Sequence, residues 1–355
     1  TVCSLVCNHE NQCEGHCVLG RKGAPVHFSS IENYISTTYA NQMTNGPAKS
    51  NGMRVAIIGS GPAGITIAII LARYGYQVTI FEGKDKIGGV LRYGIPEFRL
   101  PKSVLDDIEY RHLNLKGIKV RPNTTIGSAI SINDLFRDGY KAIFVGTGVW
   151  KPNTLHIKGE TFGNVHFGIN YLNNPDSYHL GEKVIVIGAG NAAMDVARTA
   201  IRKGVHTLTC FSITKEVAAS HYEYSYAQLE GVQFEYNKKP VEIKDNGVIF
   251  KDVIENDDGS FTEVDGTEKL YEADSVIISI SQGPQNRLVN TTEGLKSNSR
   301  GLLEADETGH TSRPGIFASG DVVNGARTVV EAVAHSKIVA ESMHKYMQSL
   351  PKDEE

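Results

Sequence analysis

Short runs of apolar and β-branched residues recur along this chain, separated by polar stretches and by glycine-rich turns. Such runs are typical of buried strands in a parallel sheet, and several of the stretches between them have helical spacing of apolar positions. The strand-like runs are RVAII, QVTIF, AIFVG, KVIVIG, HTLTCF, SVIISI and GIFASG. Alternating strands and helices predict an α/β fold.

The longest apolar run covers residues 55–72 and contains enough residues to span a bilayer. Gly59, Gly61, Pro62 and Gly64 interrupt it, and a strand-like segment follows it. We therefore interpret the run as a strand, a turn and a helix, and we expect no membrane span.

Composition places the chain among ordinary globular proteins. It has 355 residues, of which 40% are hydrophobic and 21% are charged, which predicts two or three domains. The net charge of −4 argues against a nucleic-acid binder. No charged and apolar leader of the secretory type is visible, so we expect a cytoplasmic location.

The N-terminal segment concentrates four of the five cysteines, namely Cys3, Cys7, Cys13 and Cys17. Two disulfides, one zinc site and iron–sulfur ligation are the alternatives. The spacing C-x3-C-x5-C-x3-C differs from the paired CxxC knuckles of common zinc sites. Residues 31–43 look helical, and residues 45–52 (NGPAKSNG) have the composition of a linker.

A first dinucleotide-binding pattern follows the linker. A strand runs into the turn GSGPAG at 59–64, a helix follows, and a second strand ends at Glu82. Gly59 permits the tight turn, Gly61 lets the backbone approach a pyrophosphate, and Gly64 lets the helix lie close to the strand. The helix N-terminus favours phosphate, and Glu82 can accept hydrogen bonds from ribose hydroxyls.

A second unit of the same kind begins at KVIVIG. Gly188, Gly190 and Ala193 occupy its three fingerprint positions, and a small third residue is common in sites for nicotinamide dinucleotides. Two such turns in one chain predict FAD together with a nicotinamide dinucleotide. The alternative is a glycine-rich helix start that binds no ligand.

Two further turns fit a flavoprotein. Gly146, Thr147 and Gly148 lie at the end of one strand, and Gly320-Asp321 lies at the end of another, with a helix beginning near Thr328. In flavoproteins with two dinucleotides, this aspartate contacts the ribityl chain of the flavin. The helix N-terminus then favours the anionic reduced ring.

With GGVLRYGIPEFRLPK (88–102), the chain resembles the glutamate synthase small (β) subunit family. That family of FAD/NAD(P)-dependent oxidoreductases includes the N-terminal half of dihydropyrimidine dehydrogenase and the large subunit of NADH-dependent ferredoxin:NADP oxidoreductase. The matching pieces also include the cysteine segment, GSGPAG, GTG, GAGNAAMD, ISQGPQN (280–286, with Gly283) and GIFASGDVVNGARTVVEAV. They span nearly the whole chain.

The resemblance implies two Rossmann-like domains after a small α-helical iron–sulfur segment, with the FAD domain interrupted by the NAD domain. The expected boundaries are 1–48 for the iron–sulfur segment, 50–160 with 288–350 for FAD, and 161–287 for NAD(P). The implied FAD contacts lie in the matched motifs: Gly61, Ala63, Glu82, Gly89, Leu91, Arg99, Gly148, Asp321 and Thr328. The implied nicotinamide-nucleotide contacts are Gly190, Asn191 and Ala192.

Relatives carry an arginine pair after the second strand of the nicotinamide unit and another arginine downstream, and these bind the 2′-phosphate of NADP. Here the three positions fall on Ser212, Ile213 and Ser220. A charge-assisted hydrogen bond contributes roughly 1.5–3 kcal/mol, so losing two or three weakens NADP binding by about two orders of magnitude or more. Lys215 could supply a positive charge, but its ammonium group lacks the planar guanidinium geometry with which arginine binds a phosphate. We therefore expect NAD(H) to be preferred over NADP(H).

In relatives, two [4Fe–4S] clusters share the cysteine segment. The resemblance implies that Cys7 and Cys13 ligate one cluster together with Glu32, that Cys17 ligates the other, and that the counterpart of Cys3 is often not a ligand. Nothing precedes Thr1 in this chain to complete either set. We expect an upstream segment or another polypeptide to supply the missing thiolates, or the four cysteines to close one cluster alone.

The resemblance implies an enzyme that is an electron-transfer flavoprotein subunit, passing electrons between NAD(H) and the iron–sulfur clusters of a partner through FAD. The expected partner is a larger redox subunit: a glutamate synthase large subunit, a ferredoxin or a metal-dependent oxidoreductase. Alternatives are a stand-alone NAD(P)H:ferredoxin or sulfide-type oxidoreductase, a glutamate synthase β subunit using NADPH, and a subunit without turnover. No CxxC lies near the flavin motifs, and we expect Cys210 to be a buried core thiol.

Overall fold

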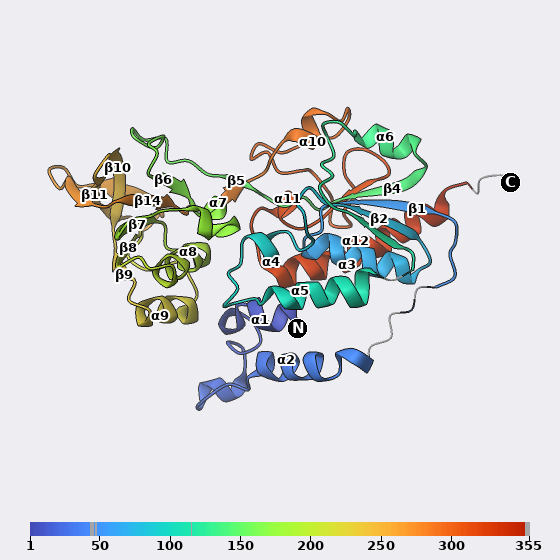
Figure 1. Ribbon diagram of the computed structural model, residues 1–355, viewed down its shortest axis with the longest axis horizontal. Helices are drawn as coiled ribbons and strands as arrows, with labels where there is room; N and C mark the ends of the chain where they lie inside the picture. The colour runs from blue at the N-terminus through green and yellow to red at the C-terminus, as the bar shows by residue number, and fades with distance from the viewer. Residues whose placement is uncertain (43–45, 47, 115, 352–355) are drawn as a thin grey trace. The chain divides into compact units, whose positions relative to one another are not determined.

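The computed structural model describes residues 1–42, 46, 48–114 and 116–351 (Figure 1). The linker expected at 45–52 and the helical stretch expected at 31–43 each include residues outside this part. By internal contacts the chain divides into two compact units. Unit 1 comprises Thr1–Arg92, Glu97–Lys151 and Gly283–Glu355, and unit 2 comprises Tyr93–Pro96 and Pro152–Gln282.

Unit 1 is built on a five-stranded sheet in the order β16-β4-β1-β2-β3, and all of its strand pairs are parallel. Its strands are β1 (Arg54–Ile58), β2 (Gln77–Phe81), β3 (Ile118–Arg121), β4 (Tyr140–Val145) and β16 (Ile316–Ala318). Because β16 pairs with β4, the C-terminal part of the chain completes the sheet that the first part begins.

The helices of unit 1 cover this sheet. Figure 1 shows α3 and α12 side by side. The helices that follow the linker are α3 (Pro62–Arg73), α4 (Val90–Tyr93), α5 (Lys102–Ile108), the π-helix η4 (Glu109–Leu113), α6 (Ile132–Arg137), α10 (Arg287–Asn290), α11 (Asp321–Asn324) and α12 (Val329–Ser349). Strand residues such as Ile143 and Ile316 pack with Leu135 and Leu303 in a buried core.

The cysteine segment forms short helical elements. They are α1 (Val2–Val6), the 3-10 helices η1 (His9–Asn11) and η2 (Val18–Arg21), α2 (Phe28–Thr38) and the 3-10 helix η3 (Ala40–Gln42). Helices α1 and α2 pack against each other, and Thr1 Oγ1 donates to Ser36 Oγ at 2.9 Å. The expected helical character of this segment is confirmed.

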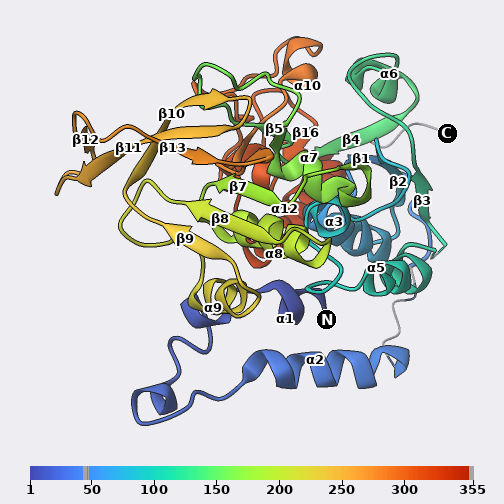
Figure 2. The ribbon, with the colours of Figure 1, turned by 60° about the vertical axis from the view of Figure 1, so that its left-hand side comes forward.

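Unit 2 contains a second parallel sheet, in the order β6-β14-β7-β8-β9. Figure 2 shows β7, β8 and β9 as neighbouring strands with α8 against them. The elements are β6 (Val165–Phe167), α7 (Gly168–Asn173), the 3-10 helix η5 (Pro175–Ser177), β7 (Lys183–Ile187), α8 (Asn191–Arg202), β8 (Thr207–Phe211), α9 (His221–Leu229), β9 (Gln233–Glu235) and β14 (Ser275–Ile278).

An antiparallel sheet covers the other face of this parallel sheet. Its strands are β10 (Lys238–Lys244), β11 (Gly247–Glu255), β12 (Phe261–Glu263) and β13 (Lys269–Glu272). Val184 and Val186 face the helices, whereas Ile185 and Ile187 face the antiparallel sheet, because strand side chains alternate between faces. Phe211 of the parallel sheet and Phe250 of the antiparallel sheet stack where the two sheets meet, with their ring centroids 3.9 Å apart.

Where the chain passes between the units, β5 (Lys151–Pro152) pairs with β15 (Gln282–Gly283). The predicted α/β class, with two Rossmann-like sheets after a helical segment, is confirmed, and each of the seven strand-like runs contributes a strand. The antiparallel sheet was not predicted, because its strands mix charged and apolar residues without a long apolar run. Among the described residues, no helix is both long and apolar enough to cross a membrane.

Candidate dinucleotide and cluster sites

The first glycine turn joins β1 to α3, and its shape requires glycine at two positions. Gly59 has a φ of +96°, and a Cβ there would lie 2.6 Å from the carbonyl oxygen of Gly146. A Cβ on Gly64 would overlap the carbonyl oxygen of Gly59. Gly61 differs, because a Cβ there would meet no atom within 4 Å. The backbone at Gly61 is therefore open to an approaching ligand.

Pro62 occupies the first turn of α3, where its fixed φ suits the helix and its missing N–H is no loss. Gly61 is the N-cap residue and contributes no capping side chain, so the first N–H groups of α3 are left for another acceptor. Such a helix start favours an anion.

Glu82 is buried at the end of β2, where its carboxylate accepts hydrogen bonds from the turn. The Ser60 backbone N–H donates to Glu82 Oε2 at 2.9 Å, and the Ser60 hydroxyl donates to the same oxygen. The Lys84 N–H donates to Oε1 at 2.8 Å. Sequence reasoning selected Glu82 and missed Ser60, which also accepts the Gly88 N–H on its hydroxyl. The one signal for Ser60 in the sequence is its place between the fingerprint glycines Gly59 and Gly61.

The first residues of the segment 88–102, Gly88 and Gly89, lie beside this turn. A Cβ on Gly89 would lie 2.9 Å from Gly61 Cα, so Gly89 and Gly61 are in direct contact. Leu91 is buried in α4, and Arg99 is half-buried before Leu100. The structure thus places Gly89 against the backbone of the turn at Gly61.

The motif GTG follows β4. The Gly146 N–H donates to the Ile58 carbonyl, which ties this strand end to the end of β1. Gly148 has a φ of +69°, and the Trp150 indole N–H donates to the Thr147 carbonyl at 3.0 Å. Gly283, a further sequence candidate, lies in β15, which pairs with β5.

The last motif meets the first one at Gly320. A Cβ on Gly320 would lie 3.4 Å from Ala63 Cβ, so the turn before α11 touches the first turn of α3. Asp321 follows, and the Arg327 N–H donates to its Oδ1 at 3.2 Å. Burial raises the pKa of Asp321 to about 6, and the nearby Glu331 acts in the same direction. The carboxylate is ionised at neutral pH and can accept a further hydrogen bond.

Thr328 is the N-cap of α12. Its hydroxyl donates to Glu331 Oε2 at 2.6 Å and accepts the Glu331 N–H at 3.3 Å, which forms a capping box. The expected helix start near Thr328 is confirmed.

The second glycine turn joins β7 to α8 in unit 2. Gly188 has a φ of +131°, and a Cβ there would overlap the Ser279 carbonyl oxygen. Gly190 is open like Gly61, with no atom within 4 Å of an added Cβ. Asn191 and Ala192 begin α8, and Ala193 is fully buried where the helix meets the sheet. The two turns therefore share one arrangement: the first glycine is crowded by a carbonyl oxygen, and the second has open space where a Cβ would lie.

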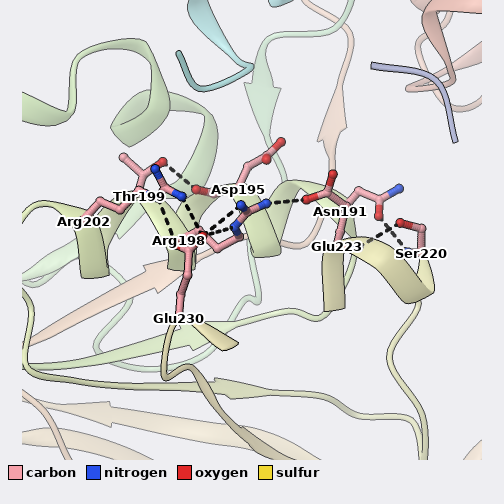
Figure 3. A network of polar contacts seen from close by, with 8 residues as sticks. All are labelled: Asn191, Asp195, Arg198, Thr199, Arg202, Ser220, Glu223 and Glu230. Atoms are coloured by element: carbon pink, nitrogen blue, oxygen red, sulfur yellow. Dashed lines mark hydrogen bonds and ion pairs between the residues drawn. The ribbon is translucent and has the colours of Figure 1, made fainter. Parts of the chain in front are cut away.

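The segment after β8 folds back onto the second turn. The Ala219 N–H donates to the Ala189 carbonyl at 2.9 Å, and the Ser220 N–H donates to Asn191 Oδ1 at 2.8 Å. Ser220 also caps α9 by accepting the Glu223 N–H. Figure 3 shows the contacts of Ser220 with Asn191 and Glu223 beside the side chains of Arg198, Arg202 and Glu230, which join α8 to α9. Sequence reasoning found none of the residues that join the helices.

The three positions at which the resemblance implies arginines in relatives are uncharged here. Ser212 is buried, its N–H donates to the Glu235 carbonyl, and its hydroxyl lies 2.8 Å from Thr214 Oγ1. Ile213 is half-exposed, and Ser220 is the helix cap described above. The expected core position of Cys210 is confirmed, since it is fully buried and burial raises its pKa.

The four N-terminal cysteines form no disulfide with one another. Burial raises the pKa of Cys7, and the negative charges of Cys13, Cys3 and Glu32 add to this, which places these groups near one another. Cys17 differs, because backbone N–H groups of Val26, Leu19 and Gly20 lower its pKa. These donors favour a thiolate at Cys17.

In the part of the chain that the structure describes, no three His, Cys, Asp or Glu side chains are arranged to hold a metal ion. The donor set still suits a cluster, because thiolates are the ligands of iron–sulfur centres. A glycine that sequence reasoning missed shapes the segment: a Cβ on Gly15 would overlap the Glu10 carbonyl oxygen.

Comparison with protein families gives two matches. The pyridine nucleotide-disulphide oxidoreductase model matches residues 53–336. The model of dihydropyrimidine dehydrogenase domain II, 4Fe-4S cluster, matches residues 1–44.

Curated relatives match along nearly the whole chain. The glutamate synthase [NADPH] small chain of Escherichia coli K12 is 31% identical over 98% of this chain and 80% of its own length. The NAD-dependent dihydropyrimidine dehydrogenase subunit PreT homolog of Salmonella typhi is also 31% identical, over 98% of this chain and 82% of its own. The NADP(+)-dependent formate dehydrogenase subunit beta of Moorella thermoacetica is 32% identical over 98% of this chain and 54% of its own.

Among solved structures, Mycobacterium tuberculosis FprA in complex with NADPH superposes with a TM-score of 0.71. It is 15% identical and covers 83% of this chain and 85% of its own. At this identity the likeness shows the fold.

Proposed function

The chain belongs to the pyridine nucleotide-disulphide oxidoreductase family, as a relative of the glutamate synthase small chain, and from this premise we propose that it is an electron-transfer flavoprotein subunit. It would pass electrons between NAD(H) and the iron–sulfur clusters of a larger redox enzyme through FAD. One observation carries the proposal. Each of two parallel sheets presents a glycine turn with an open backbone, at Gly61 and at Gly190, in a chain that begins with a cysteine-rich segment.

FAD fits unit 1. The open face of Gly61 and the unsatisfied helix start behind it suit a pyrophosphate. The buried carboxylate of Glu82 and the half-buried carboxylate of Asp321 suit ribose and ribityl hydroxyls. The proposed contacts come from the four motifs that meet around the turn: Gly59, Gly61, Pro62, Ala63, Gly64, Glu82, Gly89, Leu91, Arg99, Gly146, Thr147, Gly148, Gly320, Asp321 and Thr328. Bound FAD supplies two-electron exchange with nicotinamide and one-electron exchange with clusters.

The chain's own residues would bind FAD and orient it. The start of α3 places N–H groups toward the phosphates, and Ser60 holds the Glu82 carboxylate at the edge of the turn. Asp321 follows Gly320, which lies against Ala63, and its carboxylate can accept hydrogen bonds from a polyol above its pKa of about 6.

The nicotinamide nucleotide is assigned to unit 2. Gly188 and Gly190 form its turn, and Asn191, Ala192 and Ala193 begin the helix whose N-terminus would face the phosphates. We propose NAD(H) as the preferred nucleotide, because Ser212, Ile213 and Ser220 offer no cation for a 2′-phosphate. The relatives include proteins described as NADPH-, NADP(+)- and NAD-dependent, so the preference that we propose rests on these three positions alone.

For the cysteine segment we propose two cluster environments. We assign Cys7, Cys13 and Glu32 to one [4Fe–4S] cluster. Burial and then the negative charges of Cys13, Cys3, Glu32 and Glu14 raise the pKa of Cys7, so Cys3 contributes to the same environment. The N–H donors around Cys17 support its assignment to another. Cysteines from elsewhere would complete both sets, and the alternative is a single cluster that includes Cys3.

The proposed partner is a larger redox subunit in the cytoplasm: a glutamate synthase large subunit, a ferredoxin or a metal-dependent oxidoreductase. One second candidate has a specific observation behind it. The likeness to the glutamate synthase [NADPH] small chain favours a glutamate synthase β subunit. Glutamate formation from glutamine and 2-oxoglutarate by the purified complex separates this candidate from the others.

The deciding experiment is an anaerobic titration of the purified complex with NADH and then NADPH. We expect NADH to bleach the flavin absorbance and to produce EPR signals of reduced clusters, and we expect NADPH to act only at much higher concentration. A preparation without flavin absorbance, or one that neither nucleotide bleaches, would refute the proposal. Equal response to both nucleotides would refute only the NAD(H) preference.

A further inference from the structure

A buried arginine joins α8, which begins at the second glycine turn, to α9. Only 8% of the Arg198 side chain is exposed, in the middle of α8. It donates to Glu223 Oε2 at 2.8 Å and, through two nitrogens, to Glu230 Oε1 at 2.9 and 3.1 Å. Its guanidinium carbon also lies 5.2 Å from the centre of the Tyr226 ring. All of these partners belong to α9 or to the residue that follows it.

Glu223 connects this arginine to the nucleotide turn. Its side chain accepts from Arg198, while its backbone N–H donates to Ser220 Oγ. The Ser220 N–H donates in turn to Asn191 Oδ1, and the Ala219 N–H donates to the Ala189 carbonyl. We call Ala219 and Ser220 the lip, since they border the turn that Gly190 leaves open. A continuous series of hydrogen bonds thus runs from Arg198 to the lip (Figure 3).

We propose that Arg198 is a positioning residue for the nicotinamide nucleotide, acting through Glu223 on the lip. The inference rests on the proposed function, in which the Gly188–Asn191 turn binds that nucleotide. By holding α9 in place, Arg198 keeps the lip and the Asn191 side chain ordered before the nucleotide arrives. A preordered site binds more tightly because less conformational entropy is lost on binding.

The alternative role for Arg198 is to stabilise the α8–α9 packing alone. Arg202 provides the comparison, since it also donates to Glu230, at 2.7 and 3.0 Å, but its side chain is 47% exposed. Lysine at position 198 would keep the charge without the fork that reaches two carboxylates. The arginine-to-lysine change therefore tests geometry separately from charge.

The experiment measures flavin reduction in the purified complex by rapid mixing, with the nucleotide that reduces the native protein. The dependence of the rate on nucleotide concentration yields an apparent Kd and a limiting rate. For Arg198→Ala we expect the apparent Kd to rise about tenfold, the equivalent of one charge-assisted hydrogen bond. The limiting rate should stay within about twofold of native, because a residue that acts only on binding leaves the chemistry unchanged.

We expect Arg198→Lys to fall between native and Arg198→Ala, and Arg202→Ala to bind like native. Should Arg198→Ala fail to fold, Glu223→Gln, which keeps the volume and removes the charge, is expected to raise the apparent Kd several-fold. Equal apparent Kd values in the native, Arg198 and Glu223 variants would overturn the inference, as would an equal rise in Arg202→Ala. A native complex that no nicotinamide nucleotide reduces would reject the proposed function, and this inference with it.

Discussion

The backbone N–H and the hydroxyl of Ser60 both donate to Oε2 of Glu82, so the middle of the first glycine turn is bonded to the end of the neighbouring strand. The contact joins residues on β1–α3 and β2 that lie far apart in the sequence. It leaves the rest of the Glu82 carboxylate beside the turn, where a ribose would lie in the proposed FAD site.

The first prediction concerns Glu82→Gln. The amide would place an NH2 group opposite one of the donors from Ser60 and Lys84, so the proposed acceptor for the ribose is weakened and misaligned. We expect FAD affinity to fall about tenfold, measured as flavin released on ultrafiltration. Glu97→Gln, at an exposed position of the same unit, is the control and should retain flavin like the native protein. Unchanged retention in Glu82→Gln would contradict the assignment.

The two neighbouring glycines Gly61 and Gly64 should respond differently to alanine. Gly64→Ala places a Cβ on the Gly59 carbonyl oxygen, so we expect a loss of a few kcal/mol in the free energy of unfolding. Gly61→Ala meets no neighbouring atom, so the flavin-free protein should keep native stability while FAD affinity falls. Denaturant melts of the flavin-free proteins and flavin titrations separate the two effects. A Gly61→Ala protein that binds FAD normally would be inconsistent with the proposed site.

Asp321 should make the flavin-free protein less stable as the pH rises. Burial raises its pKa to about 6, above the value of about 3.9 in an unfolded chain. The native state therefore binds the proton more tightly, and the stabilisation is complete below about pH 4 and is lost as the pH rises through 6. Asp321→Asn should flatten this slope and add up to about 2 kcal/mol of stability at pH 7. Denaturant melts between pH 4 and 8 measure how the free energy of unfolding changes with pH.

Asp134 provides a control of opposite sign. Hydrogen bonds from Ser131 lower the pKa of Asp134, so its stabilisation is present at neutral pH and is lost as the pH falls through the lowered pKa. Asp134→Asn should leave the slope between pH 4 and 6 intact. A slope that persists in Asp321→Asn would show that another group causes it.

Nucleotide preference should shift through Ile213. Ser212 is buried and bonded, and Ser220 holds the lip, whereas Ile213 is half-exposed and can accommodate a longer side chain. We expect Ile213→Arg to improve the apparent Kd for NADPH about tenfold relative to NADH, since an arginine can bond a 2′-phosphate. Ile213→Gln is the uncharged control and should leave the ratio unchanged. A native protein that already prefers NADPH would contradict the premise.

Single cysteine replacements should separate the two proposed clusters. Cys7→Ser and Cys13→Ser are expected to abolish or alter the same EPR signal of the reduced complex, whereas Cys17→Ser should affect a different one. Cys3→Ser should leave both signals. If all four replacements remove a single common signal, the four cysteines form one cluster instead. Cys210→Ala, in the core of unit 2, is the control that should change none.

Much of the fold could be predicted because it depends on local patterns. Each of the seven apolar runs forms a strand, and the glycines of both turns lie where a Cβ would collide or where the backbone is open. The family likeness could be recognised because its motifs are contiguous in the sequence. The antiparallel sheet escaped prediction because residues such as Lys239, Lys251 and Glu263 pair across its strands, a pattern without local periodicity.

The sequence by itself determined the two strand–turn–helix units, since hydrophobic period and glycine placement act over neighbouring residues. Only the tertiary structure decided that Ala63 touches Gly320, that Ser60 holds Glu82, and that Arg198 reaches Glu223. These contacts join residues distant in the chain, and no local signal encodes them. They arise because packing brings the ends of separate elements together, where buried polar groups must find partners.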